Sequence, residues 1–378
     1  MDQRKRILYW TPRFWPDIGG IEVLAMNALP MLQKRNYEFA VITDHGDQKL
    51  PDEMLYEGTP VHRFHFRRAL KKDLKQVLKI RHQITELRNS FQPDLVHLHH
   101  PGYIAYFHLQ TQAASPCPTL LTIHTDFPTA RGGTDTLLGQ AVRSASWVTA
   151  VSKATLTDAC AIVPEICDRS SLIYNGLGTP TISPAPLPFD SPHILCLGRL
   201  VPEKGFDLAL RAFAALRRQF PEARFTIAGD GELRNDLEKQ AAQLGLNGRI
   251  TFTGWVSPDK IPALINTSTV VVVPSRYREP FALVALQAAQ MARPVVATNI
   301  GGLCESVSDQ QTGLLFENEN VTALTEAIAY LLKHADVAVE MGGKARLRAL
   351  EIFGLDAHVG AYDALYTKLI ENKGSRAI

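Results

Sequence analysis

The residues best suited to chemistry lie in the stretch REPFALVALQAAQ, residues 278–290, between the apolar runs TVVVV and PVVAT. Pro280 favours the first position of a helix, because its ring fixes φ and no N–H donor is needed there. Glu279 would then be the N-cap, a position where Ser, Thr, Asp or Asn is usual. A carboxylate at the N-terminus of an otherwise apolar helix is therefore a candidate for binding or catalysis.

The same helix start is a candidate anion site. The N–H groups of Phe281, Ala282 and Leu283 would lack partners inside the helix and, with the helix dipole, would suit a diphosphate. Gln287 follows Glu279 by eight residues. That spacing is about 12 Å along a helix axis, similar to the span of a nucleotide sugar from sugar ring to ribose. The alternative is a core helix with one polar group at its edge.

Two further loops carry residues that could bind phosphate. In LGRLVPEKG, Arg199 and Lys204 follow an apolar run and could hold a diphosphate, Arg through its planar fork and Lys as a point charge. In DIGGIE, Gly19 and Gly20 precede a helix and would let an anion approach the backbone. Solvated loop charges and a flexible loop are the alternatives.

Histidines gather in DLVHLHHP, where strand alternation places His97 and His99 on one face and His100 on the other. Three imidazoles suggest zinc, but no Cys, carboxylate pair or H-E-x-x-H completes a ligand set, so hydrogen-bonding histidines are the favoured interpretation. His124 in TIHTDFP ends an apolar run and could donate a hydrogen bond to a sugar hydroxyl or a phosphate. Because HTD is not a D-x-D motif, no metal is expected at the site.

Short β-rich runs alternate along the chain with longer helical patterns. This alternation predicts parallel sheets covered by helices, which would position the candidate residues. Helices are expected over residues 21–33, 69–89 and 335–373. Doubly wound sheets bind ligands outside the carboxyl ends of their strands, where the candidate residues lie. The predicted strands are RILYW, FAVIT, VHRFHF, DLVHLHH, TLLTIH and SWVTAVS, then HILCLG, RFTIAG, RITFTG, TVVVVPS, PVVAT and GLLF.

The length of 378 residues predicts two domains. Residues 176–192 contain five prolines and little periodic hydrophobicity, so they are expected to form a semi-rigid linker. The predicted first domain is 1–180, joined by a C-terminal helix over 357–378. The linker proper is 181–192, and the second domain is 193–356.

Composition excludes several classes of protein. With 46% hydrophobic residues, 21% charged residues and a formal net charge of +2, the chain resembles a soluble globular protein and not a general nucleic-acid binder. Its five cysteines form no C-x-x-C pair and predict neither a disulfide framework nor a metal site. No apolar run is long enough to span a membrane and no signal peptide is evident, so a cytoplasmic location is expected.

The motifs together resemble a known family. GGIE, HTD, AVSKAT, YNG, GRLVPEKG, IAGDGELR, FTGWVS, PSRYREPFALVALQAAQ and VVATNIGGLCESV follow the order and spacing seen in the retaining family-four glycosyltransferases. The resemblance covers nearly the whole chain and is most specific in its second half. It implies an α/β GT-B fold, in which two Rossmann-like doubly wound parallel-sheet domains face a central cleft, and a reaction without metal or other cofactor. It also implies that the last helix returns to the first domain.

The resemblance implies a role for each matching residue. Gly20 would approach the diphosphate of a nucleotide-sugar donor, and Arg199 and Lys204 would neutralise it. Glu279 would accept hydrogen bonds from the donor sugar, while the amides that follow it would hold a phosphate. His124 would lie beside the transferred sugar.

Gln287 departs from the family pattern, which has a second glutamate there for the ribose hydroxyls. An amide oxygen can accept one such hydrogen bond, but charge-assisted bonds are roughly twice as strong, so weaker ribose binding is expected. This departure supports an alternative, a glycosyltransferase-like protein that binds a sugar nucleotide without turnover. A sugar-nucleotide epimerase on the same architecture is a further alternative.

The predicted function is transfer of a sugar, with retention, from a nucleotide diphosphate sugar, UDP- or GDP-linked, to a glycan, lipid-linked or small-molecule acceptor. Because no carboxylate pair of the retaining-glycosidase kind is present, the leaving phosphate would assist removal of the acceptor proton.

Residues 67–82 form a basic segment with few acidic residues. If the segment is helical, its basic face could bind anionic lipid. The protein would then be peripheral on the inner face of a membrane. A solvated basic face is the alternative. The basic residues are Arg67, Arg68, Lys71, Lys72, Lys75, Lys79 and Arg81.

Overall fold

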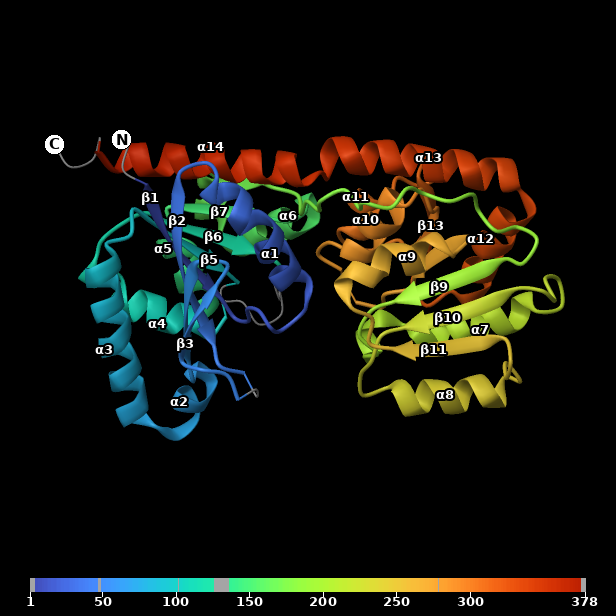
Figure 1. The fold of residues 1–378 in the computed structure, drawn as a ribbon, viewed down its shortest axis with the longest axis horizontal. Coiled ribbons are helices and arrows are strands. Elements are labelled where there is room, and N and C mark those ends of the chain that lie inside the picture. Colours follow the sequence, from blue (N-terminus) through green and yellow to red (C-terminus); the bar gives the residue numbers. More distant parts are fainter. Residues whose placement is uncertain (1–3, 47–48, 101, 126–135, 278, 375–378) are drawn as a thin grey trace. The chain divides into compact units, whose positions relative to one another are not determined.

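A computed structural model of the chain describes residues 4–46, 49–100, 102–125, 136–277 and 279–374. It divides into a first unit, Met1–Gly176 with Leu355–Ile378, and a second unit, Leu177–Gly354. Each unit consists of one sheet and the helices that cover it (Figure 1). The expected first domain ended at residue 180, so this division assigns residues 177–180 to the second unit. Asp126, Arg278, the side chain of Lys72 and residues 375–378 lie outside the described part.

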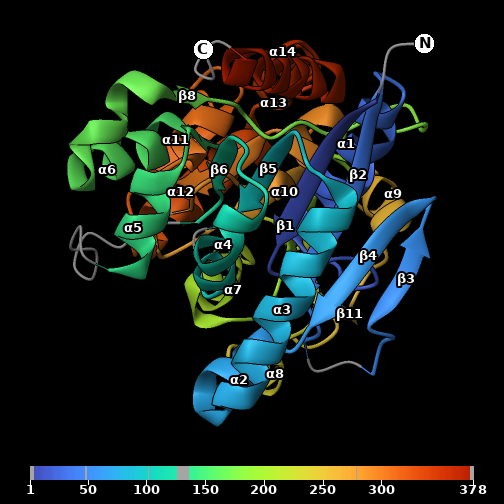
Figure 2. The same ribbon diagram turned by 90° about the vertical axis from the view of Figure 1, so that its left-hand side faces the viewer.

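The first unit contains an eight-stranded sheet in the order β3-β4-β2-β1-β5-β6-β7-β8. Neighbouring strands are parallel, except β3 and β4 at one edge, opposite β8 (Figure 2). The strands are β1 (Lys5–Thr11), β2 (Tyr37–Asp44), β3 (Glu53–Tyr56), β4 (Thr59–Phe64), β5 (Leu95–His99), β6 (Thr119–Ile123), β7 (Trp147–Ala150) and β8 (Ser170–Leu172).

Helices cover both faces of this sheet, because alternate residues of its central strands are apolar on both sides. Ile7 and Tyr9 of β1 belong to a core cluster with α1 and α14, whereas Leu8 and Trp10 belong to a cluster with α3 to α6. The helices are α1 (Gly20–Gln33), α2 (Phe66–Lys72), α3 (Leu74–Phe91), α4 (Ile104–Thr111), α5 (Leu137–Ser144), α6 (Lys153–Ile162) and α14 (Leu355–Gly374), with 3₁₀ turns at Gln112–Ala114 and Pro164–Arg169.

The second unit contains a six-stranded parallel sheet in the order β11-β10-β9-β12-β13-β14. The order reverses between β9 and β12, because the chain builds outward from β9 to β11 and then returns to build from β12 to β14. The strands are β9 (His193–Leu197), β10 (Arg224–Ala228), β11 (Ile250–Gly254), β12 (Val270–Val273), β13 (Val295–Thr298) and β14 (Gly313–Phe316).

Its helices also pack on both faces of the sheet, so that Ile194 and Cys196 of β9 enter one core cluster and Leu195 enters the other. They are α7 (Phe206–Leu216), α8 (Arg234–Gln243), α9 (Ile261–Asn266), α10 (Leu283–Gln290), α11 (Leu303–Ser306), α12 (Val321–Lys333) and α13 (Ala335–Ile352), with 3₁₀ turns at Pro202–Lys204 and Pro258–Lys260.

The fold confirms the prediction of two Rossmann-like parallel-sheet domains. Every run predicted as a strand contains one, and β3 and β8 were not predicted. The helix expected over 69–89 is interrupted at Asp73, whose carboxylate accepts a hydrogen bond of 2.9 Å from the Gln76 N–H and caps α3. None of the described helices has the length and hydropathy of a membrane span.

Candidate functional site

The strongest candidate site lies in the second unit, where the loops after β9 and β12 meet. These neighbouring strands are the point at which the strand order reverses, the place where open α/β sheets bind ligands. The loop after β9 carries Arg199 and Lys204, and the loop after β12 carries Glu279. Sheet topology therefore brings together residues that are 75 positions apart in sequence.

The centre of the site is an ion pair between Lys204 and Glu279. Lys204 Nζ donates to Glu279 Oε2 at 2.6 Å, and the Ser275 hydroxyl donates to the same oxygen at 3.0 Å. The two charged side chains are 28% and 15% exposed. A ligand can therefore reach both of them, and the carboxylate has a fixed orientation before anything binds.

Close backbone contacts hold the two loops in place. Gly205 has a φ of +64°, and a Cβ there would lie 2.0 Å from the Pro274 carbonyl oxygen. Gly302, in the loop after β13, donates its N–H to the Glu279 carbonyl at 2.6 Å, and a Cβ on it would lie 1.9 Å from the Pro280 oxygen. Glycine is required at both positions because any side chain would push the loops apart.

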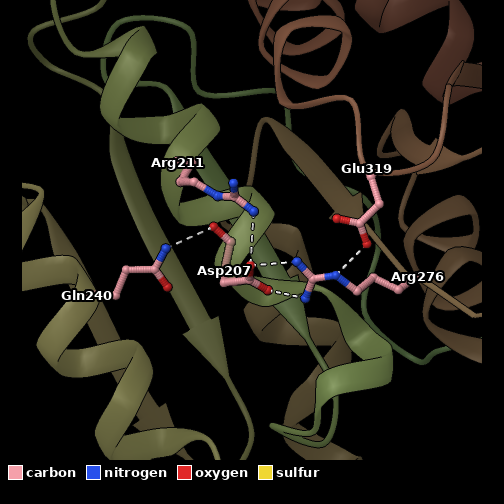
Figure 3. Close-up of polar contacts among 5 residues, drawn as sticks. All are labelled: Asp207, Arg211, Gln240, Arg276 and Glu319. Carbon is pink, nitrogen blue, oxygen red and sulfur yellow. Dashed lines mark hydrogen bonds and ion pairs between the residues drawn. The ribbon is translucent and has the colours of Figure 1, made fainter.

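A salt-bridge network joins the loop after β12 to α7 (Figure 3). Arg276 forms a bidentate pair with Asp207 at the start of α7, with Nη2 2.6 Å from Oδ2, and its Nε donates to Glu319. Arg211 also contacts the Asp207 carboxylate, at 3.1 Å. Burial alone would raise the pKa of Asp207, but the hydrogen bonds and charge of Arg276 outweigh it and lower that pKa. Asp207 and Arg276 therefore stay charged and fix Ser275 and Glu279 relative to α7.

The predicted start of α10 was wrong. The helix begins at Leu283 with Ala282 as an extended N-cap, so Glu279 and Pro280 precede it. Gly302 holds the Glu279 carbonyl, which explains why the chain does not turn helical at Pro280. None of the described hydrogen bonds uses the N–H of Ala282 or Leu283, so both remain available to an anion at the helix start.

Arg199 and Gln287 complete the candidate residues of this unit. Arg199 is exposed in the loop after β9, and no carboxylate among the described residues pairs with it. Gln287 lies partly exposed on α10, and its amide has no described hydrogen-bond partner. Both side chains are thus free to contact a ligand.

In the first unit, His124 follows β6 and ends a row of buried histidines. His124 Nε2 lies 2.8 Å from His99 Nδ1, and His99 Nε2 lies 3.2 Å from His97 Nδ1. His97 in turn contacts the Tyr366 hydroxyl of α14 at 2.6 Å and the Thr122 hydroxyl at 2.7 Å. The prediction that His97 and His99 share a face and form hydrogen bonds is confirmed.

Burial keeps His124 in its neutral form. Burial, followed by the charges of His358 and His100, lowers the pKa of His124 to about 3. Burial likewise lowers the pKa of His97 and of His99 well below the ordinary value. A neutral imidazole can present one N–H to a ligand while its other nitrogen is held by His99.

Gly20 is the first residue of α1 and is exposed after the loop that follows β1. The N-cap, Gly19, provides no side-chain cap, and the buried carboxylate of Glu22 lies next to it, where a Cβ on Gly19 would be 2.5 Å from Glu22 Oε2. β1 and β6 are separated by β5 in the sheet. The structure thus places Gly20 and His124 on loops that follow two non-adjacent strands.

The sequence did not identify two residues that shape these sites, Ser275 and Arg276, nor the contact of His99 with His124. Ser275 and Arg276 lie in the quoted motif PSRYREP, yet nothing in the motif shows that Arg276 pairs with a carboxylate 69 residues away. His99 was recognised only as a strand histidine, and its contact with His124 depends on the pairing of β5 with β6.

Two family models match the chain, Glycosyltransferase Family 4 over residues 18–179 and Glycosyl transferases group 1 over residues 181–348. A GDP-mannose-dependent alpha-(1-6)-phosphatidylinositol monomannoside mannosyltransferase of Mycobacterium tuberculosis is 36% identical over 163 residues, 42% of each chain, so the match spans less than half of that relative. A glycogen synthase of the same species is 30% identical over 305 residues, 76% of this chain and 71% of that protein. The chain belongs to the family-four glycosyltransferases.

Solved structures bear on the fold of this family-four glycosyltransferase. The sucrose-phosphate synthase (tll1590) from Thermosynechococcus elongatus matches with a TM-score of 0.84 and 21% identity, over 98% of this chain and 100% of that one. The predicted GT-B fold is confirmed.

The depressed pKa of His124 makes the stability of this family-four glycosyltransferase depend on pH. Unfolded His124 gains a proton below about pH 6.5, whereas the folded chain resists it until about pH 3. The stability it contributes is therefore complete above pH 6.5 and falls with pH below it, by about 1.4 kcal/mol per pH unit. His124→Gln should reduce the slope of unfolding free energy against pH by about this amount.

Urea unfolding between pH 8 and pH 5 measures this slope. His82→Gln is the matched control, because His82 lies exposed on α3 with 72% of its side chain accessible. Equal slopes for the wild type and His124→Gln would show that His124 takes up its proton in the folded chain.

Proposed function

We propose that the chain transfers a sugar, with retention of configuration, from a UDP- or GDP-linked sugar to a glycan, lipid-linked or small-molecule acceptor. The observation that carries the proposal is the Lys204–Glu279 ion pair at the strand-order reversal, in loops that also carry Arg199 and lead to the N–H groups at the start of α10. These groups offer cations and amide donors for a diphosphate and a carboxylate for sugar hydroxyls. The name of the GDP-mannose-dependent relative supports a nucleotide-sugar donor.

Binding of the donor rearranges the partners of Lys204. The diphosphate takes the Lys204 ammonium and the Arg199 guanidinium, which frees one oxygen of Glu279 to accept from hydroxyls of the sugar. Ser275 still donates to Glu279 and limits rotation of the carboxylate. The amides of Ala282 and Leu283 bind the phosphate that departs with the nucleoside.

In the transfer step the acceptor oxygen forms a bond to the anomeric carbon as the bond from that carbon to the phosphate breaks. The acceptor proton passes to an oxygen of the departing phosphate. Negative charge grows on that phosphate in the transition state, so fixed cations and amides at Lys204, Arg199 and α10 lower the barrier. In the first unit, neutral His124 can donate a hydrogen bond to a sugar hydroxyl and carries no positive charge. These residues perform the reaction without a metal.

Lys204→Met tests this function. Removing one fixed donor from a developing anion should lower kcat by about a hundredfold or more. The assay measures transfer and donor hydrolysis with a panel of UDP-, GDP- and ADP-sugars, and NMR of the product gives the anomeric configuration. Lys239→Met is the matched control, because Lys239 is 73% exposed on α8 and pairs only loosely with Asp236, at 3.7 Å.

Wild-type protein that binds a sugar nucleotide but turns over none of the panel would identify the silent binding protein instead. An inverted product would contradict retention, and equal loss of activity in both lysine variants would remove Lys204 from the site.

Gln287→Glu tests the ribose contact. A carboxylate accepts a stronger hydrogen bond than an amide, by about 1 kcal/mol, so nucleoside diphosphate should bind roughly fivefold tighter. Isothermal titration with UDP and GDP measures the change. Gln243→Glu adds the same charge at an exposed position at the end of α8, and unchanged or weaker binding in Gln287→Glu alone would place Gln287 outside the ribose site.

We also propose that the basic segment over residues 67–82 contacts anionic lipid on the inner face of a membrane, which would make the protein cytoplasmic and peripheral. Sequence periodicity grouped Leu70, Leu74 and Leu78 with the apolar positions of this segment, yet they are 39%, 73% and 53% exposed. Apolar side chains beside the exposed Lys75 and Lys79 form the combination that interfacial helices use. A basic helix face that contacts only water would not require exposed leucines.

Leu74→Asp and Leu78→Asp should each weaken binding to vesicles that contain anionic lipid, by about tenfold, because each removes a side chain that would enter the lipid. Co-flotation at low salt measures the bound fraction. Leu347→Asp is the control, since Leu347 is 70% exposed on α13 of the second unit. Wild-type protein that fails to float with anionic vesicles would end the lipid proposal.

A further inference from the structure

Three side chains with metal-binding atoms converge at one edge of the first unit's sheet. β2 and β4 are paired in parallel up to Asp44 and Phe64, so His45 and His65 are the next residues on neighbouring strands. β3 runs antiparallel to β4 and begins at the same end of it, where the Arg63 N–H donates to the Asp52 carbonyl at 2.7 Å. Strand pairing therefore places Asp52 beside both histidines.

The three side chains are close enough to share one ion. The candidate ligand atoms of His45, Asp52 and His65 all lie within 4.8 Å of one another. His45 Nε2 is 2.8 Å from Asp52 Oδ1, and the imidazoles of His45 and His65 are stacked with centroids 4.1 Å apart. No other group of three such side chains in the described part of the chain is as close.

The hydrogen bonding of these histidines differs from that of the row that ends at His124. In that row His97 and His99 use both nitrogens in hydrogen bonds. His45 is 5% exposed, and its Nδ1 has no hydrogen-bond partner among the described residues. A buried polar atom without a partner is costly and calls for an explanation, and a bound ion beside it is one.

We propose that His45, Asp52 and His65 bind a zinc ion. Two imidazoles and a carboxylate are a zinc ligand set that leaves a fourth position for water. This ion is separate from the proposed transfer reaction and shares no residue with it. The ion joins β2, β3 and β4 at the edge of the sheet.

Zinc binding requires movement of the ligands, because the stacked imidazoles of His45 and His65 must turn to direct one nitrogen each at the ion. Bonds of about 2.1 Å place tetrahedral ligand atoms about 3.4 Å apart, so a pair at the 4.8 Å limit would close by roughly 1.4 Å, while His45 Nε2 and Asp52 Oδ1, now 2.8 Å apart, would separate slightly. The Asp52 side chain is 84% exposed and can rotate to do so. A cavity of about 70 Å³ borders Asp52 and His65, with room for the water ligand, since a water needs about 10–15 Å³.

The charge state of the site suits a cation. Asp44 and Asp52 supply negative charge near His65, opposed by Arg68. His65 is also the N-cap of α2, so the ion fixes the position at which the basic segment leaves the sheet.

Zinc titration of chelator-treated full-length protein tests the proposal by calorimetry and by the shift in Tm. The wild-type protein should bind one zinc ion, and its Tm should increase when zinc is added. Loss of a supporting contact costs ten- to a hundredfold in metal affinity, so loss of a ligand in His65→Gln should cost about a hundredfold or more. Asp52→Asn should weaken binding by at least about tenfold and changes an exposed side chain, so it preserves the fold.

His82→Gln is the control, because it removes an exposed imidazole of the same unit and should leave the affinity unchanged. Absence of zinc binding to wild type overturns the proposal. So does equal affinity in wild type and Asp52→Asn, which would place the zinc on other histidines or on cysteines.

Discussion

The ion pair between Lys204 and Glu279 depends on how closely the backbone can pack at the strand-order reversal of the second unit. The loop after β9 reaches Glu279 because Gly205 lies against the Pro274 carbonyl, and Gly302 holds the next stretch from the other side. Two positions without side chains thus determine where a cation and a carboxylate meet. The Asp207–Arg276 pair then keeps this arrangement rigid without occupying Glu279, so the site is organised before a ligand arrives.

The strands were predictable where burial makes them continuous apolar runs, as in TVVVV for β12. β3 and β8 have half-exposed residues and no such run, and they exist because a neighbouring strand pairs with them. The start of α10 shows the opposite error, in which the local sequence predicted a helix start that a tertiary contact prevents. Pro280 favours a first helical position, but the hydrogen bond from Gly302 to the Glu279 carbonyl delays the helix to Leu283.

The candidate site was predictable as a set of residue types but not as a set of contacts. Motif order located Arg199, Lys204 and Glu279, whereas the pairing of Lys204 with Glu279 follows from the adjacency of β9 and β12. The histidines illustrate the same limit. His97 and His99 share a face because a strand alternates, but the contact with His124 requires β5 beside β6, and the proximity of His45 to His65 requires β2 beside β4.

The helix α14 lies in the first unit although it follows the whole second unit in sequence (Figure 1). Val359, Tyr362 and Tyr366 fill a core cluster with Ile7 and Tyr9, and Tyr366 also closes the histidine row. On the ribosome, residues 177–354 emerge before this helix does and can fold as a unit. Until α14 is made, one face of the first unit's sheet is covered by α1 but lacks the α14 part of its core. The domain whose strands are synthesised first is thus the last to complete its core.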